Sequence, residues 1–345
     1  MLMRMKKIEV RKRINKLLDK KDFYHLKKNA KVIYLPGGSD REFYRIIDEI
    51  TFVAMFTSTK KEVKDYRRIQ KYLLDKGIGV PEILVADSDE ELILMEDVGT
   101  TSLYSIVKET ADMGFIEFLY KLVIRSLLHL QIEGNSGIEK CKPVYKRVFD
   151  NDVLRWESDY FSLGFLESFC DFSRTEIKKL DKDFHNLALS LVDEPLFFMH
   201  RDFQSQNIFF NNSFVRIIDF QSAHRGILTY DLVSLLRDAY VTLPKEMRDR
   251  LFAFYYSLLQ EKVDIYRDFK TFRRVYVLSA IQRNMQALGA FYFLSWLRKK
   301  KWFIKAIPQG LKYLKEGLDE IDEFKALREI VYSSKVIKCV SSIVL

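Results

Sequence analysis

The sequence has few of the residues that mark unusual classes of protein. Only 13 glycines and 6 prolines occur among 345 residues, which excludes a collagen-like chain and a low-complexity disordered one. The three cysteines, Cys141, Cys170 and Cys339, lie far apart, and none belongs to a C-x-x-C motif. A disulfide scaffold and a zinc ribbon are therefore not expected, and the cysteine content fits the reducing cytoplasm, where we expect the protein.

Long apolar runs are also missing. No stretch approaches 18 consecutive apolar residues, so the sequence predicts no transmembrane helix and no stable membrane insertion. The amino-terminal segment is basic but lacks the apolar core of a secretory signal. Hydrophobic residues still make up 48% of the chain and aromatic residues 14%, which is enough for a core. The length suits one large domain or two of moderate size.

Positive charge exceeds negative charge by nine, and much of the excess is local. Residues 1–31 carry twelve Lys and Arg side chains, and residues 298–301 form a second basic run. Such clusters attract nucleic acid, an anionic membrane surface or an anionic substrate, or they form only a solvated helix face. No RNA-binding or helix-turn-helix signature accompanies them, so we expect no nucleic-acid partner. Binding of the basic amino-terminal segment to an anionic surface stays open.

Hydrophobic patterns divide the chain into two parts. Residues 5–28 are typical of an amphipathic basic helix. Short β-type runs and one helix follow, at 32–35, 42–47, 50–56, 60–76 (the helix), 82–87 and 91–96. Beyond position 98 helical patterns dominate, at 112–133, 151–170, 174–192, 229–241, 245–262, 268–295 and 302–322. The sequence predicts an α+β protein, with a small mixed-sheet lobe over 1–97 and a larger helical lobe over 98–345.

One β-rich interruption, at 196–219, carries the strongest chemical signal. The loop His200-Arg201-Asp202 enters a predicted hairpin, Asn207 follows Asp202 by five residues, and Asp219 follows Asn207 by twelve. Phosphoryl transfer needs this set, because a carboxylate must orient a hydroxyl and accept its proton while hard oxygen ligands hold Mg²⁺ on the phosphates. We therefore predict that Asp202 is the catalytic base and that Asn207 and Asp219 are the metal ligands.

The segment 199–238 resembles the aminoglycoside phosphotransferase and choline kinase superfamily, which shares the bilobal protein-kinase fold. Within it, the runs at 219–223 and 229–239 are similar to bacterial anomeric sugar kinases of cell-wall recycling, as are the runs at 38–45 and 282–289. Those kinases phosphorylate N-acetylmuramate and N-acetylglucosamine at C1. The resemblance implies an α+β protein-kinase-like fold, ATP and Mg²⁺ as cofactors, and a small amino sugar as the substrate. It implies structural roles for His200 and Asp231, which would brace the catalytic loop.

The resemblance also indicates where a nucleotide would bind. The run 92–98 is similar to the last strand of a kinase small lobe leading into the hinge, where adenine bonds to backbone groups. The turn at 36–41 would cover the phosphates with backbone N–H groups. The nucleotide-binding residues expected from this resemblance are Gly37, Gly38, Ser39, Arg41, Glu96 and Val98.

One position departs from the kinase pattern. Met55 stands where kinases of this fold usually carry a phosphate-binding Lys on the third strand. Four nearby cations could supply the missing charge: Arg41, Arg45, Lys60 and Lys61. The departure also keeps open a pseudokinase that binds nucleotide without catalysis, although the intact Asp202, Asn207 and Asp219 set argues against it.

A protein substrate is not expected, because only ten residues separate Asp219 from Tyr230 and no A-P-E motif follows. The groove must then be built from the helices, whose polar candidates are Glu157, Asp159, Arg237, Asp238, Gln282, Arg283 and Asn284. Of these we favour Glu157, Arg237, Asp238 and Arg283 as substrate-binding residues. Because this lobe is basic, it suits a sugar with an acidic arm, whose carboxylate Arg237 or Arg283 would bind. A choline, ethanolamine or aminoglycoside kinase is the alternative.

Overall fold

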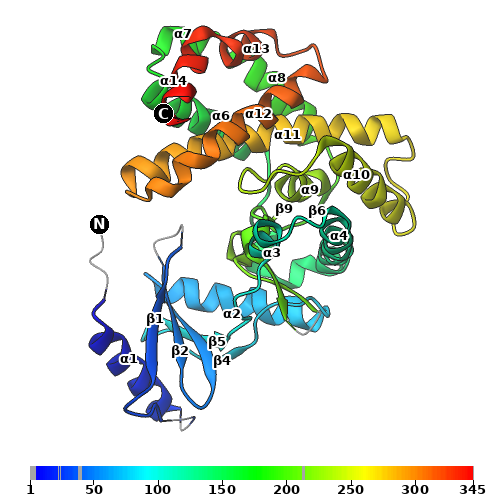
Figure 1. Ribbon diagram of the computed structural model, residues 1–345. Coiled ribbons are helices and arrows are strands. Elements are labelled where there is room, and N and C mark those ends of the chain that lie inside the picture. Colours follow the sequence, from blue (N-terminus) through cyan, green and yellow to red (C-terminus); the bar gives the residue numbers. More distant parts are fainter. Residues whose placement is uncertain (1–4, 22, 24, 38–40, 212–213, 345) are drawn as a thin grey trace.

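The computed structural model describes residues 5–21, 23, 25–37, 41–211 and 214–344. A small antiparallel sheet with one helix on each face comes first, and a much larger helical part follows (Figure 1). This arrangement confirms the α+β organisation predicted from the sequence. The sheet ends at Glu96 and the next helix begins at Leu103, on either side of the predicted boundary at 97. That the two parts are separate domains stays a prediction.

The sheet has five strands in the order β1-β2-β3-β5-β4, every neighbouring pair antiparallel. Its strands are β1 (Lys31–Leu35), β2 (Glu42–Ile47), β3 (Thr51–Phe56), β4 (Ile83–Asp87) and β5 (Leu92–Glu96). Between β3 and β4 runs α2 (Lys60–Asp75), which begins where the Thr59 side chain accepts a hydrogen bond from the Glu62 amide. The sequence placed these elements to within about one residue.

The two faces of the sheet are covered by different helices, because successive strand residues point to opposite sides. On β3, Phe52 and Ala54 belong to the core shared with α1 (Lys7–Lys20), whereas Met55 belongs to the core shared with α2. Helix α1 buries four apolar side chains against the sheet: Val10, Ile14, Leu17 and Leu18. The helix ends at Lys20 rather than at 28, since Leu18 is its last residue to reach that core.

The remainder of the chain is mostly helical. Its α-helices are α3 (Leu103–Glu109), α4 (Met113–Asn135), α5 (Lys142–Tyr145), α6 (Asn151–Phe161), α7 (Arg174–Lys178), α8 (Asp181–Val192), α9 (Leu228–Leu236), α10 (Lys245–Gln260), α11 (Phe269–Tyr292), α12 (Ile307–Asp319), α13 (Lys325–Tyr332) and α14 (Ser334–Val344). Four short strands interrupt them, with β6 (Leu196–Met199) pairing with β9 (His224–Ile227) and β7 (Ile208–Asn211) pairing with β8 (Phe214–Ile217). No helix in the described ranges combines the length and apolarity that a membrane span requires.

Four of the predicted long helices are interrupted, and the one predicted at 268–295 is α11 continued by a π-helix over Phe293–Leu297. The helix predicted at 151–170 is α6 continued by a π-helix over Ser162–Phe169, and the one predicted at 174–192 is α7 followed by α8. The helix predicted at 302–322 opens as a 3₁₀-helix over Lys301–Ala306 before α12 begins. Pro308 lies in the first turn of α12, where its missing N–H leaves no bond unmade.

Helix α11 is the centre of the helical part, and 16 of its 24 residues are buried, including every residue from Val275 to Met285. It crosses the segment that contains α6 at two glycines. A Cβ atom on Gly289 would lie 2.6 Å from the Tyr160 carbonyl oxygen, and one on Gly164 would lie 2.9 Å from the Gly289 carbonyl oxygen. The two backbones therefore touch, which a residue larger than glycine would prevent.

Candidate active site

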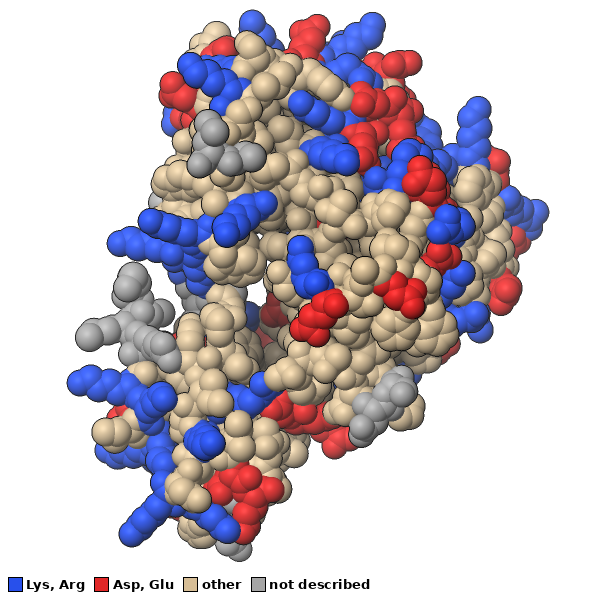
Figure 2. Space-filling model, viewed as in Figure 1, with Lys and Arg blue, Asp and Glu red and all other residues tan. Residues whose placement is uncertain are grey.

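A cavity of about 660 Å³ lies between the sheet and the helical part. Space-filling atoms leave a hollow near the centre of the molecule, with basic side chains on its rim (Figure 2). The sheet side supplies β1 to β3, the end of β5 and residues 97–100, and the helical side supplies the loop around 202–207, residues 218–222 and α11. The predicted base and both predicted metal ligands line this cavity: Asp202, Asn207 and Asp219.

The β7–β8 hairpin brings these three side chains together. Asn207 precedes β7, and its side-chain Nδ2 donates to the Asp202 carbonyl oxygen at 2.9 Å. The Ile218 amide, which follows β8, donates to the Asn207 carbonyl oxygen at 3.0 Å and so places Asp219 beside Asn207. Because its amide nitrogen is engaged in this way, the Asn207 side chain keeps its oxygen for another partner.

Buried groups hold the loop before Asp202 from behind. The Asp231 carboxylate, fully buried at the start of α9, accepts from the His200 amide at 2.7 Å and from the Arg201 amide at 2.8 Å. The His200 ring nitrogen Nε2 lies 2.9 Å from the Ile218 carbonyl oxygen. These contacts confirm the bracing roles expected for His200 and Asp231. Burial raises the pKa of Asp231 to about 7, although the two amide donors oppose that rise.

Asp238 is a second brace rather than a substrate ligand. It is 4% exposed and accepts from the Ser205 amide at 2.8 Å, from the Ser205 hydroxyl and from the Tyr240 amide at 2.9 Å. These donors occupy both carboxylate oxygens, and Asp238 is not among the residues that line the cavity. We therefore assign it to support of the 205–207 turn and correct the sequence-based interpretation.

Asp219 has the surroundings of a metal ligand. Its backbone is left-handed, with φ of 66°, and its Oδ1 accepts from the Gln221 side chain. Burial raises the pKa of Asp219, the negative charge of Asp202 raises it further, and Arg41 and His200 partly oppose this. A bound cation would relieve the repulsion between the two carboxylates. A left-handed backbone at a non-glycine residue and a carboxyl group with a perturbed pKa are both common at functional sites.

The donor set fits Mg²⁺ held on phosphates better than a cage made by protein alone. Within the described ranges, no group of three or more His, Cys, Asp and Glu side chains could hold a metal ion by itself. Mg²⁺ needs only one or two protein oxygens when phosphates and water complete its coordination. The Asp219 carboxylate and the Asn207 amide oxygen supply that number.

The predicted nucleotide-binding residues lie on the sheet side. Gly37, Arg41, Glu96 and Val98 all line the cavity. Gly38 and Ser39 lie outside the described residues. The Glu96 side chain forms an ion pair with Arg216 of β8 at 2.9 Å, which connects the end of the sheet to the β7–β8 hairpin. The backbone of 96–98 thus borders the cavity at the position expected of a hinge.

The structure separates the four candidates for the missing cation. Met55 itself is buried under α2. Arg45 makes two bonds to the Asp97 carboxylate, at 2.6 and 2.8 Å, and one to the Gly99 carbonyl oxygen. Lys60 pairs with Asp89 and Lys61 with Asp65, and neither lysine lines the cavity.

Arg41 remains as the candidate that both faces the cavity and lies near the metal ligands. Its guanidinium forms an ion pair with Glu62 of α2 at 3.3 Å. It is close enough to Asp219 to lower the pKa of that carboxyl group. In protein kinases a third-strand Lys pairs with a helix Glu in the same way, so Arg41 and Glu62 can replace that pair from the neighbouring turn.

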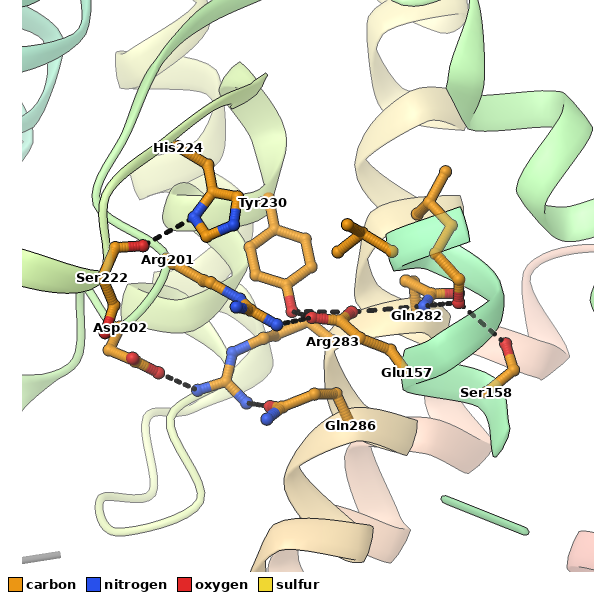
Figure 3. Close-up of polar contacts among 12 residues, drawn as sticks. Glu157, Ser158, Arg201, Asp202, Ser222, His224, Tyr230, Gln282, Arg283 and Gln286 are labelled. Carbon is orange, nitrogen blue, oxygen red and sulfur yellow. Dashed lines mark hydrogen bonds and ion pairs between the residues drawn. The ribbon is translucent and has the colours of Figure 1, made fainter. Parts of the chain in front are cut away.

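On the helical side, one arginine lies beside the predicted base. Arg283 of α11 has its Nη2 atom 3.8 Å from Asp202 Oδ1, as Figure 3 shows. Its Nε donates to the Ser234 hydroxyl at 3.0 Å and its Nη1 to the Gln286 side chain at 2.7 Å. Arg283 therefore presents a fixed positive charge where an acceptor hydroxyl would approach Asp202.

Two further substrate candidates lie elsewhere. Arg237 is 5% exposed, pairs with Glu320 at 2.9 Å and donates to the Tyr313 carbonyl oxygen at 3.1 Å, away from the cavity. Glu157 is fully buried and bonds to Arg201. Neither can touch a substrate without breaking these contacts, so we do not retain them as substrate-binding residues.

Sequence reasoning missed most of the acceptor wall. Apart from Arg283, this wall is formed by Tyr240, Gln286, Ala287, Ala290, Phe291, Leu294, Trp302 and Phe303. The positions on α11 follow helical spacing from Arg283, which could have found them. No pattern in the sequence indicates that Trp302, which follows the end of α11, lines the same cavity as Arg283.

Comparisons with known proteins agree with this geometry. Residues 32–266 match the model of a phosphotransferase enzyme family. A curated relative from Neisseria meningitidis, an N-acetylmuramate/N-acetylglucosamine kinase, is 28% identical over 74% of this chain and 75% of its own. A relative of the same name from Pseudomonas aeruginosa is 22% identical over 87% of this chain and 88% of its own.

Solved structures share the fold at lower identity. Choline kinase from Cryptosporidium parvum has a TM-score of 0.62 at 14% identity, covering 95% of this chain and all of its own. Aminoglycoside 2′-phosphotransferase-IIIa in complex with GDP has a TM-score of 0.62 at 16% identity, covering 92% and 99%. The kinase-like fold expected from the sequence is confirmed.

Proposed function

Since this chain belongs to the phosphotransferase enzyme family, and with it to the small-molecule kinases, we propose that it transfers phosphate from ATP to the C1 hydroxyl of N-acetylmuramate and N-acetylglucosamine. The observation that carries this proposal is the convergence of Asp202, Asn207, Asp219 and Arg283 on one cavity. The names of the curated relatives support the choice of sugar.

Asp202 is the proposed base. Its loop is held by Asp231 and by Asn207, so its carboxylate is positioned before the substrate arrives. The anomeric hydroxyl of a sugar is more acidic than an ordinary alcohol, so one carboxylate suffices to orient it and take its proton. Phosphoryl transfer needs little more covalent help from the protein than this.

Asn207 and Asp219 are the proposed ligands of Mg²⁺, and Arg41 is the proposed phosphate-binding cation. The metal, when bound, would neutralise charge that develops on the transferred phosphate. Arg41 reaches the same region from the sheet side and keeps Glu62 as its partner. Backbone groups of Glu96 and Val98 would bind adenine at the rim.

The acceptor wall supports a sugar with a carboxylate. Arg283 can bind an acidic group near the reacting hydroxyl, and Phe291, Trp302 and Phe303 offer an apolar surface for a sugar ring. A cationic acceptor such as choline would meet the Arg283 guanidinium 3.8 Å from the base. The charge on this wall therefore favours the muramyl sugar over choline or an aminoglycoside.

The test is phosphorus NMR of the products formed from Mg·ATP and a panel of acceptors. The panel contains N-acetylmuramate, N-acetylglucosamine, choline, ethanolamine and kanamycin. We expect both amino sugars to react and the phosphate to appear at C1. A product phosphorylated at C6, or turnover of only choline or kanamycin, would contradict the proposed substrate. No turnover with any acceptor, together with nucleotide binding, would indicate a pseudokinase.

A further inference from the structure

A buried carboxylate lies behind the catalytic loop, on the side away from the cavity. Glu157 of α6 has no exposed surface and lies among Arg201, Tyr230 and Gln282 (Figure 3). Its carboxylate accepts from Arg201 Nη2 at 3.0 Å, from the Tyr230 hydroxyl at 2.9 and 3.0 Å and from Gln282 Nε2 at 3.2 Å. A buried carboxylate persists only with such partners, and Arg201 is the one that carries charge.

Arg201 connects this carboxylate to the reacting group, because it immediately precedes Asp202. Its backbone has φ of 80°, a conformation that costs energy for any residue except glycine. Its amide is fixed on Asp231, and its guanidinium is fixed on Glu157 and lies over the Trp156 ring at 5.8 Å. Backbone and side chain are thus held at separate points, and a change at either would turn the Asp202 carboxylate.

In many regulated protein kinases an arginine waits for a phosphorylated side chain, whose negative charge orders the active site. Here the catalytic segment is too short for a long regulatory loop, with ten residues between Asp219 and Tyr230. The partner of Arg201 is instead a carboxylate built into α6. Burial raises the pKa of this carboxyl group, and Arg201, Gln282 and Tyr230 oppose that rise, so no added phosphate is needed to place an anion beside Arg201.

We propose that Glu157 is a positioning residue that holds Arg201, and through it Asp202, in the reactive arrangement without any phosphorylation. The proposal rests on the proposed function, in which Asp202 is the base. Glu157 touches neither substrate nor nucleotide. Its effect is on the turnover number, because the geometry of Asp202 matters most when the hydroxyl attacks.

The test compares two variants that change the same carboxylate site in different ways. Glu157→Gln keeps the size and the hydrogen bond to Tyr230 but removes the charge that Arg201 needs. Tyr230→Phe removes one hydrogen bond and leaves the ion pair intact. For Glu157→Gln we expect kcat to fall by about a hundredfold, the effect of a misplacement of about 1 Å. For Tyr230→Phe we expect a loss of less than about threefold.

Three measurements separate positioning from support of the fold. The KM values for ATP and sugar should change little in Glu157→Gln, because neither ligand touches Glu157. Glu157→Asp, which restores the charge, should recover part of kcat. The double variant Glu157→Gln, Arg201→Gln should lose no more kcat than the worse of its single variants, because the two residues act as one unit.

Several results would overturn the proposal. Wild-type kcat in Glu157→Gln would do so, as would losses that multiply in the double variant. If kcat decreases in proportion to the melting temperature in both Glu157→Gln and Tyr230→Phe, then Glu157 only supports the fold. If Glu157→Gln does not fold, the same comparison uses Glu157→Asp and the double variant, whose neutral amide pair leaves no buried charge unmatched.

Independence from phosphorylation and from the sugar is tested separately. Wild-type protein treated with a phosphatase, with its mass checked for the absence of phosphate, should keep full activity, and a loss of activity would contradict the proposal. The rate of ATP hydrolysis, in which water replaces the sugar as the phosphate acceptor, is measured for the same variants. This rate should rank the variants in the same order as kcat does. If the amino sugars fail as substrates while this ranking holds, the proposed substrate is wrong and the positioning role stands.

Discussion

On each side of the cavity an arginine is paired with a glutamate, and the two pairs differ in burial. On the sheet wall, Arg41 is 19% exposed and its partner Glu62, which also accepts hydrogen bonds from Ser58, is 33% exposed, and the ion pair measures 3.3 Å. Behind the helical wall, Arg201 is 20% exposed but Glu157 is fully buried and has three partners. The arginines are equally accessible, so the carboxylates decide how each pair behaves.

A half-exposed carboxylate can exchange its partner for water, whereas a buried one cannot. Arg41 is therefore able to turn from Glu62 to an incoming phosphate, and Arg201 stays where it is. We therefore expect the wall proposed to receive the nucleotide to be adjustable and the wall that carries the proposed base to be fixed. A kinase that binds a flexible triphosphate but needs a precisely placed base benefits from both.

The strongest test of the fixed wall is the substitution of the proposed catalytic base, Asp202. Asp202→Asn should lower kcat by roughly two to four orders of magnitude, the usual contribution of a positioned base. The dissociation constant for ATP should stay within about twofold, because the nucleotide contacts belong to the other wall. Steady-state kinetics and calorimetric titration with ATP check the two parts, and turnover at the wild-type rate would remove Asp202 from its role.

The metal ligands come next in size. Asp219→Ala should raise the Mg²⁺ concentration needed for half-maximal activity by roughly tenfold to hundredfold or more. That range is the usual effect of losing a residue that only orients a metal ligand, and Asp219 is proposed to be a ligand itself. Asn207→Ala should have a smaller effect, since its oxygen carries no charge. Activity measured over a series of Mg²⁺ concentrations at fixed ATP gives both values. Identical Mg²⁺ curves for wild type and both variants would place the metal elsewhere.

These first two predictions depend on residues that the sequence alone identified. The spacing of Asp202, Asn207 and Asp219 is set by a local hairpin, and local structure is what sequence patterns describe well. The strands of the sheet followed for the same reason, whereas the bracing roles of His200 and Asp231 came from the resemblance to a known family.

The acceptor wall was beyond reach because it depends on packing between distant helices. Arg237 and Arg283 lie in similar helical segments, and only the tertiary structure turns one toward Glu320 and the other toward Asp202. Nothing in the run around Glu157 indicates full burial, which comes from its contacts with α9 and α11. The π-helical turns after α6 and α11 likewise arise from close helix packing and leave no mark in the hydrophobic pattern.

Arg283 separates the two sugars. We expect wild type to prefer N-acetylmuramate, and Arg283→Ala to abolish this preference in kcat/KM. The expected change corresponds to about 1.5–3 kcal/mol, or roughly 10- to 150-fold, the range for a hydrogen bond to a charged group. Arg283 also lies beside Asp202, so its removal can lower activity toward every sugar. N-acetylglucosamine, which lacks the lactyl carboxylate, is the control for that general loss.

The matched control is the other arginine. Arg237→Ala should leave the sugar preference intact while lowering the free energy of unfolding by about 3 kcal/mol, as expected when one partner of a buried ion pair is removed. An altered preference in Arg237→Ala, with none in Arg283→Ala, would reverse the assignment of the two residues.

The adjustable wall is tested through Arg41. Arg41→Ala should raise the KM for ATP about threefold to tenfold, because a partly exposed hydrogen-bonding cation contributes modestly. Lys60→Ala is the control, since Lys60 pairs with Asp89 outside the cavity and its removal should not change this KM. An equal effect of the two substitutions would mean that general positive charge, rather than Arg41, attracts the nucleotide.

The smallest expected effect concerns His224, which lies close to Arg201 in Figure 3. Burial, helped by the charge of Arg201, lowers the pKa of His224 to about 4. Between pH 6.5 and 4 the unfolded imidazole takes up a proton that the folded one refuses, so stability decreases as the pH falls through this window. In His224→Gln, the free energy of unfolding should therefore decrease less than in wild type, by up to about 1.4 kcal/mol for each pH unit in this window.

Denaturant unfolding of wild type and His224→Gln at pH 8, 6 and 5 measures this difference. His25→Gln, which replaces a side chain that is 84% exposed, is the control. If the His224→Gln and wild-type free energies of unfolding stay parallel from pH 8 to pH 5, the buried side chain is not held neutral by the fixed wall.

The contact between Gly164 and Gly289 gives the enzyme a sensitive point at two residues that do not themselves line the cavity. Because the two backbones touch there, even a methyl group would act as a wedge between α11 and the segment that carries Glu157. The wedge would also move Glu157 relative to Gln282, and with it the anchor of Arg201. We therefore expect Gly164 and Gly289, neither of which lines the cavity, to tolerate substitution as poorly as many residues that do line it.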